Sequence, residues 1–118
     1  MSEAVSGTTS VSSEVVEKIA VAAARAVPGV ADLGGDTARF VNTMLDKVGL
    51  TEVGDASRGV SAKIADGNVT VSVVLVLEAG RVVAEVTSEV QRKVTEALTG
   101  YGLKVLAVNV NVDDIAGV

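Results

Sequence analysis

The pair Asp66-Gly67 constrains this chain more than any other feature of its sequence. It lies within residues 58–78, between two runs in which apolar residues alternate with polar ones. An Asp-Gly pair in this setting predicts a two-residue β-hairpin turn, because both turn positions require a positive φ angle. We therefore expect helices laid on this hairpin and one further strand that returns to it.

The segment before the hairpin predicts a first helix that begins at Ser13 and ends at Pro28-Gly29. Ser13 is a suitable N-cap, and proline followed by glycine cannot continue a helix. The helical period places one apolar stripe on this helix, which we expect to pack on the sheet: Val15, Ile19, Ala22, Ala23 and Ala26.

The segment between Gly29 and the hairpin is less regular. Residues 30–33 could form a short strand, and Gly34-Gly35 would end it. A shorter helix is expected over residues 36–48, with Asp36 as its cap, and residues 50–57 contain the turn formers of a loop.

After the hairpin the period becomes helical from about Val82 to Leu98, and Gly100 ends this helix. Residues 103–113 alternate again and predict a last strand. Its inward side chains are expected to be Leu106, Val108, Val110 and Val112. Tyr101 is expected to be half-buried beneath the last helix. The strand, helix and strand over residues 68–113 form a crossover unit, which is right-handed in nearly all proteins.

These elements predict an α+β fold of two layers, with a small mixed sheet of three to four strands and helices packed on one face. The element order is helix, possible strand, helix, strand, strand, helix, strand. With 118 residues the chain should form one domain over residues 13–118, preceded by a flexible tail over residues 1–12. This tail lacks the features of a signal peptide, and no apolar run is long enough to span a membrane.

Composition excludes several classes of function. The chain contains neither cysteine nor histidine, so disulfides, thiolate metal sites and the commonest general base are absent. The net charge of −5 disfavours nucleic-acid backbones and anionic lipids as direct partners. With one Phe, one Tyr and no Trp, the chain offers almost no stacking platform for bases or sugars. We expect no catalytic residue, no cofactor and no metal.

The outward face of the predicted sheet is the candidate functional surface. It should be flat, with small side chains and little charge, which fits either a solvated sheet face or a protein–protein interface. The candidate interaction residues on the long strand and the last strand are Thr70, Ser72, Val74, Val76, Val105, Ala107, Asn109 and Asn111. Ser61 and Lys63 should lie beside them.

Two acidic groups are candidates for chemical sites. Asn109, Asn111, Asp113 and Asp114 could offer oxygens to calcium, but a straight strand supplies too few of them on one side. The carboxylates of Glu85, Glu89 and Glu96 share a helix with Arg92 and Lys93, which is typical of a solvated helix face.

Four motifs resemble one known family. Val-x-x-Ile-Ala…Ala-x-x-Val-Pro-Gly-Val occupies residues 16–30, and Gly-Asn-Val-Thr-Val-x-Val-x-Leu-Val-Leu-Glu-x-Gly occupies residues 67–80. Leu-Thr-Gly-Tyr-Gly-Leu follows at 98–103, and Val-Asn-Val-Asn-Val-Asp-Asp-Ile follows at 108–115. In order and spacing these motifs resemble the alkaline shock protein family of Gram-positive envelope stress response proteins. The chain departs from that pattern at Ala79, at Val83-Ala84 and at Asn111, where the family often has an aromatic residue, a proline and a histidine.

The resemblance implies a non-enzymatic, cytoplasmic scaffold or interaction protein of the cell-envelope stress response. Such proteins self-associate and gather at the inner membrane face through a membrane-anchored partner protein, without inserting into the membrane. The main alternative is a small α/β nucleic-acid-binding module, because small sheets with packed helices include RNA binders. A third class is an enzyme that acts through paired carboxylates.

Overall fold

The computed structural model describes residues 10–34 and 59–117. In order, the elements are α1 (Ser13–Arg25), β1 (Val30–Leu33), β2 (Val60–Ala65), β3 (Asn68–Glu78), α3 (Val83–Gly100) and β4 (Lys104–Ala116). The predicted strand at 30–33 is therefore present. The helix expected over residues 36–48 and the loop at 50–57 lie outside the described residues.

The sheet is built on β3, its longest internal strand. β1 and β2 both pair antiparallel with β3, β1 with its end and β2 with its beginning, and β4 pairs parallel with β3. The sheet is therefore mixed, as predicted. The hairpin turn is also confirmed, because Asp66 and Gly67 have φ angles of 53° and 78°.

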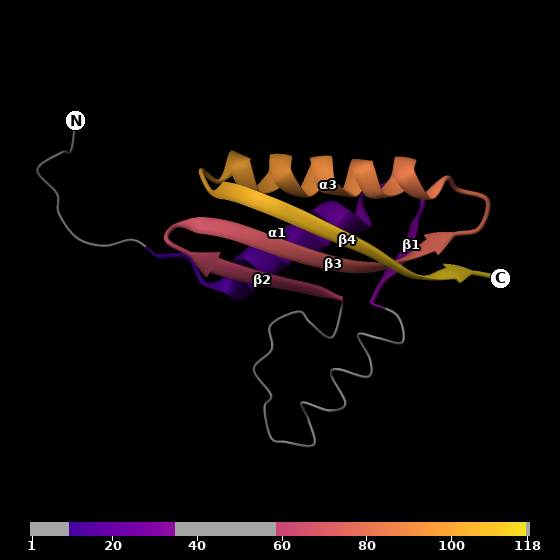
Figure 1. The fold of residues 1–118 in the computed structure, drawn as a ribbon, viewed down its shortest axis with the longest axis horizontal. Coiled ribbons are helices and arrows are strands. Elements are labelled where there is room, and N and C mark those ends of the chain that lie inside the picture. Colours follow the sequence, from indigo (N-terminus) through magenta and orange to yellow (C-terminus); the bar gives the residue numbers. More distant parts are fainter. Residues whose placement is uncertain (1–9, 35–58, 118) are drawn as a thin grey trace, which may run out of the picture.

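Both helices cover the same face of the sheet. In Figure 1, α1 passes behind the strands and α3 runs along β4. One apolar cluster joins the helices to the sheet, and its members include Leu75 and Leu77 of β3 and Leu98 of α3. This arrangement confirms the predicted two-layer α+β architecture.

The predicted apolar stripe of α1 is correct only at Ile19 and Ala23, which are partly buried against the apolar cluster. The buried side chains are Val16, Glu17, Ala20, Val21 and Ala24, whereas Val15 and Ala22 are exposed. Apolar residues occupy both the predicted stripe and the buried one, so the helical period alone cannot distinguish the two. The buried stripe also contains Glu17, whose carboxylate accepts a hydrogen bond from the backbone of β2. The cap also differs, because Ser12, and not Ser13, accepts a hydrogen bond from the Val15 N–H at 3.2 Å.

Two irregularities in β4 alter the predicted alternation. The register with β3 shifts between Val69 and Thr70 and again between Leu75 and Val76, so β4 carries an extra residue at each place. At the first shift Leu106 is the extra residue, and its side chain is 69% exposed instead of facing the core. Tyr101 is also 73% exposed, which contradicts its predicted burial.

Candidate functional site

The face of the sheet opposite the helices is the candidate interaction surface, and we call it the open face. Paired residues of neighbouring strands point to the same side of a sheet, so the register defines its members. They include Ser61 and Lys63 of β2, Thr70, Ser72, Val74 and Val76 of β3, and Ala107, Asn109, Asn111 and Asp114 of β4.

Val105 does not belong to the open face, which corrects its sequence-based assignment. It pairs with Val69, which is buried, and it packs against the apolar cluster beneath the helices. The extra residue Leu106 reverses the alternation between Val105 and Ala107. A bulge of this kind leaves no mark in an alternating apolar sequence, so the period could not reveal it. The structure brings the other seven candidate residues together on one face.

The centre of the open face is uncharged and its two ends differ in charge. Ser72 lies between Ser61 and Asn109 in one cross-strand row. Near the hairpin, Lys63 pairs with Thr70. At the opposite end, Val76 pairs with Asp32 of β1 and with Asp114 of β4. The face therefore carries a mild positive end and an acidic end.

Two glycines flatten the open face beside Val74. The Val74 N–H donates to the Gly59 carbonyl at 2.6 Å, and the Val74 carbonyl accepts from the Gly34 N–H at 2.8 Å. Both neighbours lack a side chain, so the half-buried Val74 stands against bare backbone on this edge. A flat centre with small side chains is suited to contact with a second flat surface.

The acidic residues of β4 do not form a metal site. Among the described residues no group of three or more His, Cys, Asp or Glu side chains is placed to hold a metal ion. The Asp114 carboxylate accepts a hydrogen bond from the Ile115 N–H at 2.8 Å. Asn109 and Asn111 share the open face with uncharged neighbours. The geometry therefore favours a polar strand end over a calcium site.

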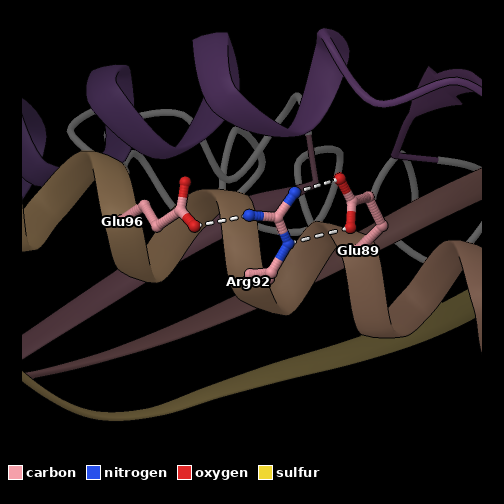
Figure 2. Close-up of polar contacts among 3 residues, drawn as sticks. All are labelled: Glu89, Arg92 and Glu96. Carbon is pink, nitrogen blue, oxygen red and sulfur yellow. Dashed lines mark hydrogen bonds and ion pairs between the residues drawn. The ribbon is translucent and has the colours of Figure 1, made fainter.

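On the charged face of α3, Arg92 lies between Glu89 and Glu96 and binds both carboxylates (Figure 2). Arg92 Nε and Nη2 donate to the two carboxylate oxygens of Glu89 at 3.0 and 2.6 Å, and Nη1 donates to Glu96. The hydrogen bond from Arg92 lowers the pKa of Glu89, and the positive charges of Arg92 and Lys93 lower it further. These residues lie outside the buried stripe of α3, so they form the solvated helix face that the sequence predicts.

Replacing Arg92 by glutamine should raise the pKa of Glu89 towards its ordinary value. Because the folded-state pKa of Glu89 is depressed, its contribution to stability is present above the unfolded-state pKa. That contribution is lost as the pH falls through the folded-state pKa. Carboxyl chemical shifts followed by NMR through an acid titration measure this directly. Lys93→Gln is the matched control and should give a smaller rise; an equal rise would show that the hydrogen bond is not the main cause.

Two further features leave no sign in the sequence. Glu17 is 4% exposed and accepts a hydrogen bond from the Ala62 N–H at 2.9 Å. At the hairpin end of the molecule, an apolar groove is lined by Val11, Val15, Ile19, Tyr101 and Leu103 together with Lys18. The sequence prediction hides both, because it assigns Val15 to the core and leaves Glu17 out of the buried stripe.

Two helices on one face of a mixed four-stranded sheet, with the open face opposite them, define a two-layer α+β domain. The chain matches the model of the alkaline shock protein 23 family, which is described as having a cell envelope-related function, over residues 1–117. The chain therefore belongs to this family, the one that its four motifs resemble.

Solved structures of the MamM CTD share this fold. One of them, a zinc form, superposes with a TM-score of 0.56 at 15% sequence identity and covers 86% of this chain and 84% of that chain. A second variant of the MamM CTD gives a TM-score of 0.57 at 15% identity and covers 86% of this chain and 93% of that chain. At this identity the likeness concerns the fold alone.

The length and the side chains of a helix determine whether it can cross a membrane. Neither α1 nor α3 combines the length and the apolar character that crossing a membrane requires.

The charge of the open face bears on the nucleic-acid alternative. Lys63 lies on this face, and Lys104 lies on the same side at the hairpin end, because it pairs with Asn68, two residues before Thr70. The opposite end is acidic, through Asp32 and Asp114. A nucleic-acid module needs a basic or aromatic platform, so this surface gives that alternative no support.

Proposed function

We propose that this chain is a non-enzymatic interaction protein of the cell-envelope stress response, which self-associates and is held at the inner membrane face by a membrane-anchored partner protein. The observation that carries the proposal is the open face. Its centre carries hydroxyl, amide and small aliphatic side chains and no charge, and a shortage of charged side chains is a feature of interface cores. The envelope-related function of the family supports the same conclusion.

The geometry of the open face favours a protein partner over a small molecule. In its central rows β3 is flanked by short polar and small side chains, and Gly34 and Gly59 lie beside Val74. The apolar groove at the hairpin end, by contrast, is a hollow between the beginning of α1 and the turn after α3. Small ligands bind in concave sites, whereas flat uncharged surfaces bind other proteins. The charge difference between Lys63 and the acidic end adds an orientation to such a contact.

Two lysines placed in the centre of the open face should abolish capture of the partner. The double variant Ser72→Lys and Asn109→Lys puts two like charges side by side, because these residues pair across β3 and β4 and are both exposed. The purified chain should capture a membrane-anchored protein from a detergent extract of the envelope, and the double variant should capture at least about tenfold less. Quantitative mass spectrometry of the captured protein measures the loss.

The matched control is Ala22→Lys with Ser88→Lys, which adds the same charge to exposed positions on the two helices. It should capture the partner as well as the unmodified chain does. Equal capture by both double variants would show that the open face is not the binding surface. Self-association is tested separately by light scattering over a range of concentrations, and a strictly monomeric mass throughout would contradict that part of the proposal.

A further inference from the structure

The positive charges of the open face lie at the hairpin end. Lys63 of β2 pairs with Thr70, and Lys104 of β4 pairs with Asn68 on the same side of the sheet. Asp66 belongs to the hairpin turn, beyond the last paired row of β2 and β3. The hairpin end of the open face therefore carries a net positive charge.

The negative charges lie at the other end of the same face. Val76 of β3 is flanked by Asp32 of β1 on one side and by Asp114 of β4 on the other. Asp113, which is the extra residue of β4 at this place, precedes Asp114 in the chain. Glu78 also belongs to this end, but its carboxylate is already bound by an arginine of the same copy. This end therefore carries a net negative charge.

The charges at both ends are available to a second molecule. None of the ion pairs between residues that the structure describes includes Lys63, Asp32 or Asp114. These residues are exposed. Each of the two aspartates accepts a hydrogen bond from the backbone N–H of the next residue, which leaves its negative charge in place.

The positions of these charges along β3 are symmetric. Lys63 lies level with Thr70 and the aspartates lie level with Val76, and Val73 lies midway between these levels. β1 and β2 follow one another along the same edge of β3, because the Val74 backbone binds the end of one and the beginning of the other. A half-turn about an axis across the strands at Val73, in the plane of the open face, therefore carries Lys63 onto the level of the aspartates.

Two copies stacked by this half-turn place opposite charges together. Lys63 of each copy faces the acidic end of the other, where Asp32 lies along the same edge. In the centre, Asn109 of one copy faces Asn111 of the other, and amide groups both donate and accept hydrogen bonds. A half-turn about an axis along the strands would bring the two acidic ends together instead. The charges therefore select the antiparallel arrangement.

The area of the open face is sufficient for such a contact. β3 has 11 residues, so the face is about 36 Å long, and three neighbouring strands make it about 14 Å wide. Two stacked faces of this size bury roughly 1,000 Å² in total. Specific interfaces begin at about this area, so the contact is expected to be weak and reversible.

From the charge, symmetry and area of the open face we infer that two copies of this chain pack face to face through it, with their strands antiparallel. The contact is isologous, because each copy uses the same surface. Sheets that pack in this way keep their strands within about 30° of each other. The inference rests on the self-association in the proposed function and names its surface. The same face is assigned to the membrane-anchored partner, so one copy binds either a second copy or the partner through it.

Charge reversal at one end at a time provides the test. Lys63→Asp places an aspartate against the acidic end of the second copy. The double variant Asp32→Lys with Asp114→Lys places two lysines against Lys63 of the second copy. The changed residues are exposed, so the fold should persist, as circular dichroism would show. The two-fold axis repeats each repulsion, so light scattering should show at least about tenfold weaker self-association for either variant.

An equimolar mixture of the two variants should associate again, as a heterodimer. The new aspartate of one variant then faces the new lysines of the other, and the remaining Lys63 faces the remaining Asp32 and Asp114. Both contacts are attractive, whereas each homodimer has two repulsive ones. Native mass spectrometry with one variant isotope-labelled should show the heterodimer in excess over either homodimer.

Lys93→Asp is the matched control, because it makes the same change of charge at an exposed position of α3. This variant should self-associate as the unmodified chain does. Equal association of the control and the two reversed variants, or a mixture without an excess of heterodimer, would show that the face-to-face contact is wrong. The self-association in the proposed function would then stand and use another surface.

A different result would overturn more than this contact. If the unmodified chain is monomeric at every concentration, the face-to-face contact and the self-association in the proposed function fail together. Capture of the membrane-anchored partner is decided separately, by the variant with Ser72→Lys and Asn109→Lys.

Discussion

Gly59→Ala should destabilise the fold by at least about 3 kcal/mol and lower the melting temperature by roughly 10 °C or more. Gly59 has a φ angle of +83°, and a Cβ atom there would lie 2.4 Å from the Gly34 nitrogen and 2.6 Å from the Val74 carbonyl oxygen. Both neighbours are backbone atoms, so no side-chain rotation can relieve the contact. The chain would have to separate the end of β1 from the beginning of β2.

Gly67→Ala is the matched control for this prediction. Gly67 has a similar φ angle of +78°, but no atom lies within 4 Å of the position of an added Cβ. Gly67→Ala should therefore lower the free energy of unfolding only by the strain of a left-handed backbone, about 1–2 kcal/mol. Urea unfolding of both variants, followed by circular dichroism, measures the difference. Equal losses of unfolding free energy would show that the approach between Gly59 and Gly34 is not what makes glycine necessary.

The backbone segments at Gly34, Gly59 and Val74 show why the sequence predicts the strands of the sheet but not the close approach between them. Alternation and the Asp66-Gly67 pair determine β2, β3 and the turn between them, because these signals are local. The approach of Gly34 to Gly59 joins residues far apart in the chain. The Asp66-Gly67 pair marks Gly67 as a turn residue, but nothing near Gly59 in the sequence shows that another backbone segment lies against it, so only the structure explains that glycine.

The residues of the open face could be predicted where the alternation of a strand is unbroken, as it is along β3. Ser72, Val74 and their neighbours on β3 follow an unbroken alternation, and the structure places them on the open face. On β4 the alternation is interrupted at Leu106, so Ala107, Asn109 and Asn111 keep their predicted face while Val105 loses it. A bulge is decided by pairing and twist, which a single strand's sequence does not contain.

The apolar groove lined by Val11, Val15 and Tyr101 could not be predicted from the sequence, for a different physical reason. An apolar helix face that points to solvent has the same sequence pattern as one that points to the core. In α1, the two faces are adjacent and both are rich in Val, Ala and Ile. The buried face is the one that contains Glu17, which ordinary hydrophobicity reasoning places outside. With the face that contains Glu17 buried, Val15 remains exposed and lines the apolar groove.

Backbone geometry shows why a carboxylate is useful at this place. The Val74 N–H donates to the Gly59 carbonyl, so hydrogen-bonded pairs between β2 and β3 alternate from Gly59 to Ser61 and onward. Ala62 falls between them, and its N–H points to the free edge of β2. A bare edge N–H is open to water or to another strand. Glu17 accepts from this N–H and ties α1 to the edge.

Glu17→Ala should therefore cost about 1–3 kcal/mol of unfolding free energy, because it removes the acceptor of a part-buried backbone N–H. Glu17→Gln retains a carbonyl oxygen at the same reach, and its unfolding free energy should stay closer to that of the unmodified chain.

Glu14→Ala is the control on the same helix, since Glu14 is exposed and its carboxylate lies 3.7 Å from the Lys18 ammonium. Exposed pairs of this kind contribute little. Urea unfolding ranks the three variants, and hydrogen exchange at the Ala62 amide reports the edge itself. If Glu17→Ala leaves both the stability and the Ala62 exchange rate unchanged, the carboxylate does not anchor β2, and the packing of α1 must be attributed to its apolar residues alone.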